Sequence, residues 1–281
     1  MTPTDAAPTL VESPLGALFD GIDVDPTTTV VEHPPESRGR VLGSVVMASS
    51  VLAAARRVDP GQRPVAIHGT FVRGGAADIP LELRIDRLHE GRSVAVLVVR
   101  ALQADRPIAS CTVRFHREPT EPDPELAWAA AEPRPAPRPE DGRPDDAVVA
   151  TLDLATGFDI RAAVAPGSVE RRVMHPYWAR ARGPLPDVPG VDEALVVALT
   201  DFGVSTSAAR PDLSLSDRRR SVTLDHALWW QRPVHADRWM LIETAPVLGA
   251  AGRGLTHGSV RDEDQVVVAS FAQEVVDPQV R

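Results

Sequence analysis

The 281-residue sequence contains no lysine and a single cysteine, and aromatic residues make up only 4% of it. One cysteine excludes an internal disulfide framework and any cluster of thiolate metal ligands. Cys111 lies in the strand-like run IASCTVRF, so we expect it to be a small buried apolar side chain. With arginine as the only basic residue besides histidine, the net charge is still −9. That sign argues against a nucleic-acid or anionic-membrane ligand.

Several motifs are also missing. No apolar run approaches the ~20 residues of a membrane span, and residues 1–14 lack the basic and apolar regions of a secretory leader. We therefore expect a cytoplasmic protein without a membrane span. The eight histidines show neither H-x-x-x-H nor H-E-x-x-H spacing, and no G-x-S-x-G nucleophile elbow is present. The sequence predicts no metal site and no cofactor.

The first half of the chain predicts one helix and a set of strands. Residues 1–14 are polar and contain prolines, which favours an N-terminal arm. The run 41–58 is apolar on most sides, rich in alanine and ends with two arginines, which predicts a buried helix. Alternating or β-branched runs predict strands at 27–33, 65–73, 80–88, 93–103 and 108–116. A sheet wrapped around a helix is an α+β unit, placed here at residues 15–118.

A second unit repeats this order after residues 119–146, whose many prolines predict an extended linker. Strands are expected at 158–164, 170–174, 177–182, 221–230, 239–245, 251–260 and 266–276, and a helix at 191–202. Arg73 and Asp78 recur as Arg232 and Asp237, each 159 residues later (232 − 73 and 237 − 78). The repeat predicts two tandem units, the second at 147–278, that pair within one chain as a homodimer pairs between chains.

Polar residues interrupt the strands expected in the stretch 221–276. Thr223, Asp225, His226 and Gln273 lie in or beside apolar runs. A polar side chain inside an apolar strand costs about 1–3 kcal/mol unless it is hydrogen-bonded. The stretch therefore holds either a satisfied polar network or a site.

The motifs of this stretch also resemble those of a known family. The order TLDHALWWxRP, GRGLxxG and VASxxQE is similar to that of the acyl-CoA thioesterase II family, the TesB-like double-hotdog thioesterases. The resemblance is strongest over 177–276 and weaker over 40–118. It implies an α+β double hotdog, with two tandem units that each wrap an antiparallel sheet around a central helix.

The resemblance implies a catalytic set as well. In the family a water is activated by an aspartate near the end of the second helix, a hydroxyl before D-H, and the glutamine of Q-E. These positions are Asp201, Thr223 and Gln273 here. A carboxylate can be the general base, and a hydroxyl and an amide can orient the water, so no covalent intermediate is expected. The repeat places Pro64 and Val113 opposite Thr223 and Gln273, which predicts one site per chain, carried by the second unit.

Other residues allow two interpretations. Arg253 lies between glycines and is either a phosphate ligand for coenzyme A or a solvated side chain. Trp229 and Trp230 either line an acyl tunnel or, as we favour, belong to the core. Asp225 and His226 look like a catalytic dyad, but adjacent strand residues point to opposite faces, which favours a structural role.

We therefore expect an acyl-CoA thioesterase that hydrolyses fatty acyl-CoA to a free fatty acid and coenzyme A. It would be a homo-oligomer, either a dimer of double-hotdog chains or higher. The alternative is a non-catalytic acyl-CoA-binding or scaffold protein with the same fold. A hotdog dehydratase or hydratase is disfavoured, because the run 41–58 lacks the histidine and carboxylate which that chemistry uses.

Overall fold

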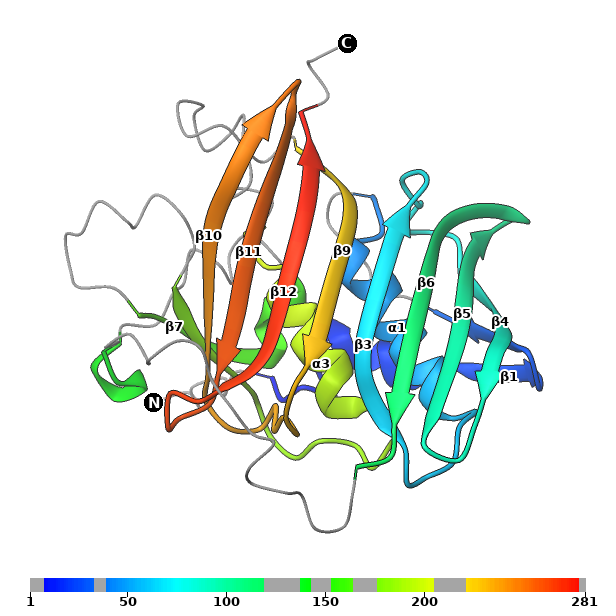
Figure 1. Cartoon of the computed structure of the whole chain (residues 1–281), viewed down its shortest axis with the longest axis horizontal. Helices are drawn as coiled ribbons and strands as arrows, with labels where there is room; N and C mark the ends of the chain where they lie inside the picture. The colour runs from blue at the N-terminus through cyan, green and yellow to red at the C-terminus, as the bar shows by residue number, and fades with distance from the viewer. Residues whose placement is uncertain are drawn as a thin grey trace, which may run out of the picture.

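Two helices lie against one face of a long antiparallel sheet in the computed structural model (Figure 1). The structure describes residues 8–32, 39–118, 137–142, 153–163, 176–204 and 221–277. The helices are α1 (Gly43–Ala55) and α3 (Val191–Thr200). No helix among these residues is both long and apolar enough to cross a membrane.

The described sheet has twelve strands in the order β1-β2-β4-β5-β6-β3-β9-β12-β11-β10-β8-β7. In the first half they are β1 (Ile22–Asp25), β2 (Thr28–Val31), β3 (Arg63–Phe71), β4 (Leu81–Glu90), β5 (Val94–Gln103) and β6 (Arg106–His116). In the second half they are β7 (Phe158–Ala162), β8 (Tyr177–Ala181), β9 (Val222–Trp230), β10 (Met240–Ala250), β11 (Arg253–Arg261) and β12 (Val267–Val276). Short 3-10 helices lie at Pro14–Phe19, Pro139–Asp141 and Asp153–Gly157.

The two halves repeat each other along the sheet. Strands β3, β4 and β5 begin 159 residues before β9, β10 and β11 (222 − 63, 240 − 81 and 253 − 94). Strands β3 and β9 pair antiparallel in the middle, so each half forms one side of the sheet around its own helix. This arrangement is the predicted α+β double hotdog.

Helix α1 is buried almost all round, as its apolar composition predicts. Twelve of its thirteen residues are buried, so small side chains are needed where it meets α3. Gly190, the N-cap of α3, has φ +76, and a Cβ there would lie 3.1 Å from the Ala55 Cβ. Glycine suits both the left-handed backbone and the close approach of the two helices. The contact places the start of α3 beside the end of α1, next to Pro64 of β3.

Several boundaries differ from the sequence prediction. The predicted strand 27–33 is the second strand of a β1–β2 hairpin, and both helices end two or three residues early. Residue Leu10 belongs to the predicted arm, yet it is fully buried and its N–H donates to the Arg182 carbonyl. In the predicted linker, the Trp178 indole donates to the Pro137 carbonyl. Residues 119–136 and 143–146 of that linker, and the predicted strand 170–174, lie outside the described residues.

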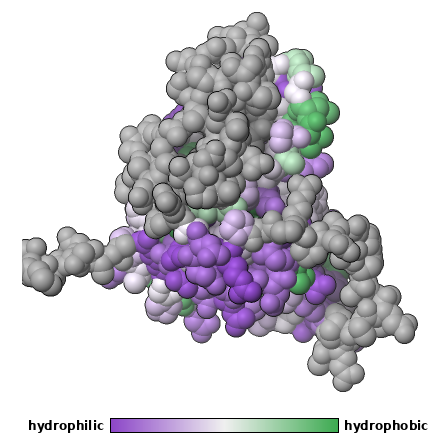
Figure 2. All heavy atoms as spheres, turned by 90° about the vertical axis from the view of Figure 1, so that its left-hand side faces the viewer, coloured by the Kyte–Doolittle hydropathy of each residue, from purple (hydrophilic) through white to green (hydrophobic). Residues whose placement is uncertain are grey.

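The outer face of the sheet is polar with a few apolar exceptions. Trp229 is 44% exposed, so its expected core position is wrong, whereas Trp230 is buried as expected. The cause is the strand period: Trp230 shares the inner face with Leu228, and Trp229 points the other way. Figure 2 views one end of the sheet; its coloured surface is mostly hydrophilic, with an apolar patch at the upper right. Val247 and Leu248 of β10 are also exposed.

Glu193 lies in the first turn of α3, where a negative charge is usually favourable, yet its side chain is buried. Burial raises the pKa of its carboxyl to about 7, and neither the backbone N–H nor the Arg63 charge offsets this. The folded protein therefore binds this proton more tightly than the unfolded chain, whose value is 4.5. The stability linked to the proton is fully present below pH 4.5 and is lost as the pH rises through about 7. The fold is therefore expected to weaken between these pH values.

Glu193→Gln mimics the neutral carboxyl at every pH. We expect thermal unfolding of the variant to match the natural chain near pH 5 and to show a gain of about 2–3 kcal/mol at pH 8. The exposed Glu263→Gln is the matched control and should change little at either pH. Equal effects of Glu193→Gln at both pH values would contradict a buried, protonated Glu193.

Candidate active site

A bulge in β9 turns Thr223 toward the helices. Gln273 of β12 lies opposite His226, Glu274 opposite Asp225, but Val275 lies opposite Thr223. Leu224 is the extra residue, and an extra residue re-aims the side chains beyond it. Without the bulge, Thr223 would share the outer face with Asp225; with it, Thr223 shares the inner face with Gln273 and Val275.

Gln273 is completely buried between Thr223 and Asp201. Its Nε2 donates to the Thr223 hydroxyl oxygen at 2.6 Å and to Asp201 Oδ1 at 3.1 Å. One amide nitrogen carries two protons, so these bonds use both. The structure therefore brings the three predicted catalytic side chains together, although they come from β9, β12 and the end of α3.

Asp201 is the C-cap residue of α3, directly after the last helical turn. Tyr177 of β8 anchors that turn by donating its hydroxyl to the Leu199 carbonyl. The second carboxylate oxygen, Oδ2, accepts a hydrogen bond from the Ser44 backbone N–H at 3.2 Å. Ser44 lies at the start of α1, so a first-half group joins a cluster that the sequence placed wholly in the second unit.

The Ser44 contact follows from helix chemistry. The first N–H groups of a helix have no partner within the helix and carry partial positive charge, which favours a carboxylate there. No sequence motif connects residue 44 with residue 201. In the sequence, the predicted helix is the only sign that residue 44 lies near a helix N-terminus. The structure shows why a glycine precedes Ser44, because an added Cβ at Gly43 would lie 2.8 Å from the Phe71 ring.

His226 lies beside the cluster on the inner face of β9. It is 1% exposed, and its Nε2 is 3.5 Å from the Thr200 hydroxyl oxygen. Burial lowers the pKa of the imidazole, and the neighbouring Asp201 and Asp225 charges only partly offset this. Asp225 is half-exposed on the other face, 4.0 Å from His68. The two adjacent residues point apart, as expected, and form no dyad.

The cluster has unused hydrogen-bonding capacity. Among the described residues, the buried Gln273 Oε1 and Ser44 Oγ have no hydrogen-bond partner. Each Asp201 oxygen accepts one bond, and a carboxylate oxygen can accept two. Because Thr223 accepts from Gln273, its own O–H proton remains available as a donor. These groups can hold and deprotonate a small polar molecule.

The predicted substrate-binding residues have other environments. Arg253 is half-exposed and forms an ion pair with Glu274 at 3.2 Å. Trp229 is exposed on the outer face of β9, and its tunnel role stays a prediction. Trp230 is buried on the inner face, and its indole nitrogen has no hydrogen-bond partner in the described part of the chain. None of the three contacts the cluster through a hydrogen bond in the described structure.

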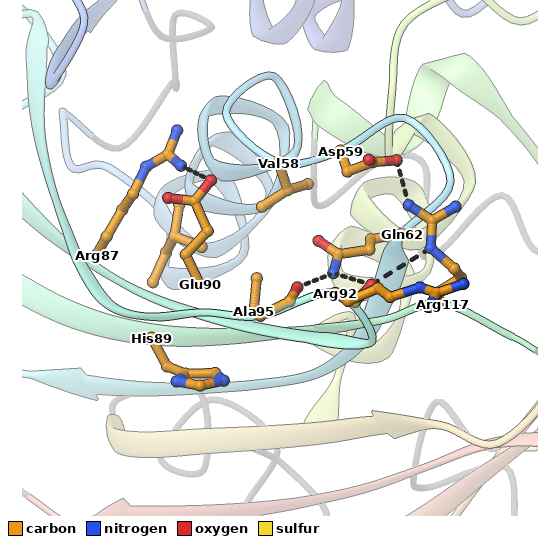
Figure 3. A pocket seen from close by; sticks show the side chains of 11 residues that line it. Val58, Asp59, Gln62, Arg87, His89, Glu90, Arg92, Ala95 and Arg117 are labelled. Carbon is orange, nitrogen blue, oxygen red and sulfur yellow. Dashed lines mark hydrogen bonds and ion pairs between the residues drawn. The ribbon is translucent and has the colours of Figure 1, made fainter.

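An arginine-lined cavity of about 180 Å³ lies at the other end of α1 (Figure 3). Arg87 forms an ion pair with Glu90, and Arg117 with Asp59. These pairs largely neutralise the charge of the cavity. A helix of thirteen residues is about 20 Å long, so the cavity is well separated from Ser44. We assign it no part in the chemistry of the cluster.

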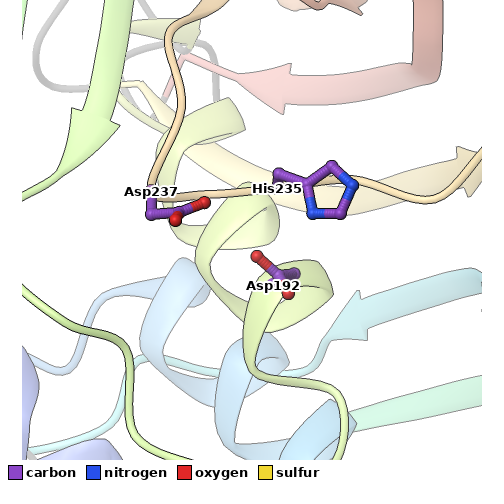
Figure 4. Close-up of side chains that lie close together, drawn as sticks. All are labelled: Asp192, His235 and Asp237. Carbon is purple, nitrogen blue, oxygen red and sulfur yellow. The ribbon is translucent and has the colours of Figure 1, made fainter.

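A second group of polar side chains lies at the start of α3. Asp192, His235 and Asp237 could each offer one metal-ligand atom, and these atoms lie within 4.8 Å of one another (Figure 4). Asp192 already accepts a bond from the Ala236 N–H at 2.6 Å, and burial raises the pKa of its carboxyl. The positive end of α3 also opposes a cation. We interpret the Asp192 bond as a link between α3 and the loop before β10.

Comparisons with known proteins cover most of the chain. Residues 33–116 match the family model for the acyl-CoA thioesterase N-terminal domain, and residues 129–276 match the model for its C-terminal domain. Acyl-coenzyme A thioesterase 8 of Mus musculus is 28% identical over 259 residues, covering 84% of this chain and 80% of that protein. Acyl-CoA thioesterase 2 of Haemophilus influenzae is 25% identical over 256 residues, covering 84% and 86%.

Two solved structures also resemble this chain over most of its length. An acyl-CoA thioesterase II from Mycobacterium marinum superimposes with a TM-score of 0.74 at 25% identity, covering 92% of this chain and 96% of that one. A tesB protein from Mycobacterium avium subsp. paratuberculosis has the same TM-score at 22% identity, covering 94% and 98%. The second likeness concerns the fold alone.

Proposed function

Because this chain belongs to the acyl-CoA thioesterase family, we propose that it hydrolyses fatty acyl-CoA to the free acid and coenzyme A through a water activated by Asp201, Thr223 and Gln273. The observation that carries this proposal is the pair of hydrogen bonds that join all three side chains through Gln273 Nε2. The names of the relatives support the substrate class.

In the proposed reaction, Asp201 removes a proton from the water as its oxygen attacks the thioester carbonyl carbon. Thr223 and the Gln273 carbonyl orient that water, since the Gln273 amide nitrogen bonds to both the Thr223 hydroxyl and the carboxylate. The tetrahedral intermediate then loses the thiolate of coenzyme A, and the carbon–sulfur bond breaks. The proton held by Asp201 goes to the departing sulfur, which restores the carboxylate.

Two features support direct attack by water over a covalent acyl-enzyme. Cys111 is completely buried, and burial raises the pKa of its thiol to about 11, so it is a poor nucleophile. The Thr223 hydroxyl accepts a hydrogen bond from the Gln273 amide, and Gln273 separates it from the Asp201 carboxylate. No described base therefore contacts the Thr223 hydroxyl proton. Asp201 remains the group best placed to act on water.

The test is release of free thiol from short-, medium- and long-chain saturated acyl-CoA by the purified chain. Turnover of at least one of them is expected. Tight binding of acyl-CoA without any release of thiol would instead favour the non-catalytic binding protein. Hydration of an enoyl-CoA without hydrolysis would contradict the thioesterase assignment.

We also propose that the chain forms a homo-oligomer in the cytoplasm. The outer sheet face supports assembly, because Trp229 and Val222 are exposed there on a central strand. Light scattering coupled to size-exclusion chromatography should give at least twice the mass of one chain. A monomer at micromolar concentration would contradict the proposal.

A further inference from the structure

We propose that the Ser44 hydroxyl, on the first-half helix α1, is a catalytic group that donates a hydrogen bond to the thioester carbonyl oxygen as that oxygen becomes negative. The inference rests on the proposed hydrolysis and assigns it a residue outside the three already named. It makes the site a composite of the two repeated units.

The position of Ser44 is the first argument. Its backbone N–H donates to Asp201 Oδ2 at 3.2 Å, so the residue touches the proposed base directly. Helical side chains tilt toward the N-terminus of their helix, which here is the end that faces Asp201. The hydroxyl oxygen is only three bonds from that N–H. Ser44 therefore lies within reach of a substrate atom held next to the Asp201 carboxylate.

The burial of the hydroxyl is the second argument. Ser44 is 1% exposed, and its Oγ has no hydrogen-bond partner among the described residues. A buried hydroxyl without a partner is destabilising, so an alanine would be the more stable choice if only packing mattered. A bound substrate oxygen would satisfy the group and would offset that cost during turnover.

The charge environment identifies which substrate atom Ser44 would contact. Ser44 lies in the first turn of α1, a helix of thirteen residues, where the helix dipole favours negative charge. During attack, negative charge develops on the carbonyl oxygen, while the water loses a proton to Asp201. The helix N-terminus and the hydroxyl thus both favour the carbonyl oxygen. Preorganised donors of this kind act in the transition state more than in the ground state.

Helix α1 supplies its own control. Ser49 is also 1% exposed, and its Oγ too has no partner in the described structure. It lies more than a turn further along the same helix and forms no hydrogen bond with Asp201 among those described. Ser44→Ala and Ser49→Ala therefore each remove one buried, unpaired hydroxyl from the same helix. Of the two residues, only Ser44 is next to the proposed base.

The experiment measures kcat and KM of the full chain on its best saturated acyl-CoA, together with the thermal midpoint of each variant. We expect Ser44→Ala to lower kcat by at least about 10-fold with little change in KM, and Ser49→Ala to leave both unchanged. Neither variant should lower the thermal midpoint, since each loses an unpaired hydroxyl. Ser44→Cys, which keeps a side-chain atom in place but donates weakly, should lose activity like Ser44→Ala and serves if alanine fails to fold.

Two results would overturn the proposal in different ways. Equal kcat for Ser44→Ala, Ser49→Ala and the natural chain would refute the Ser44 role and leave the hydrolysis intact. No turnover by the natural chain would refute the proposed function and the inference with it. A rise in KM alone would assign Ser44 to ground-state binding and would also contradict the catalytic role.

Discussion

Replacing Asp201 by asparagine should lower kcat for acyl-CoA hydrolysis by about 10²–10⁴-fold, the usual contribution of a positioned general base. Asparagine has nearly the same shape, and its one oxygen can accept the bond from either Ser44 or Gln273, so most of the geometry should survive. What it loses is the ability to take a proton. KM should change little, because the base acts on water and not on the bound substrate.

Asp225→Asn is the matched control for this substitution. Asp225 lies on the same strand as Thr223 but points to the outer face, where its side chain is 40% exposed. Its kcat should stay within about twofold of the natural chain, as for most surface changes. If both asparagine variants turn over at the natural rate, Asp201 is not the base.

The second large effect concerns the Thr223–Gln273 pair. Gln273→Ala removes the amide that contacts both Thr223 and Asp201, and should lower kcat by about 10²-fold, the scale of a lost orienting or charge-stabilising donor. Thr223→Val keeps the shape and β-branch of the side chain, and should lower kcat by about 10-fold through loss of the hydroxyl. Kinetics of the two single variants and of the double variant measure whether the groups act together.

Residues that act as one unit have effects that do not add. The double variant should therefore be only slightly slower than Gln273→Ala, instead of showing the product of the two losses. Gln231→Ala, an exposed glutamine on the loop after β9, is the control and should be silent. A double variant as slow as the product of the single effects would mean that Thr223 and Gln273 serve separate steps.

The repeat and the motif order predicted the architecture well. The repeat and the motifs are visible because each strand or helix carries its own signal, namely the spacing of its apolar residues and its length. The offset of 159 residues found for Arg73 and Arg232 recurs in three pairs of strands. Element ends were less accurate, because helix ends and hairpin lengths depend on packing against the other half.

The site was predictable only where residue type alone limited the choices. A glutamine inside the apolar run of β12 requires partners, and the structure supplies them in Thr223 and Asp201. The bulge at Leu224 could not be predicted, since simple alternation would place Thr223 on the outer face beside Asp225. The Ser44 contact depends on how the two helices pack, and no spacing within the chain encodes it. Trp229 was misplaced because composition does not say which strand face is covered.

One measurement tests the central claim most directly. The chain is allowed to turn over a limited excess of acyl-CoA in H₂¹⁸O, and mass spectrometry then locates the label in the product acid and in the peptide that contains Asp201. Attack by a water on the thioester predicts one solvent oxygen in each acid and none in the Asp201 carboxylate. Label in the Asp201 carboxylate would contradict the account, because it requires a covalent anhydride between that residue and the acyl group.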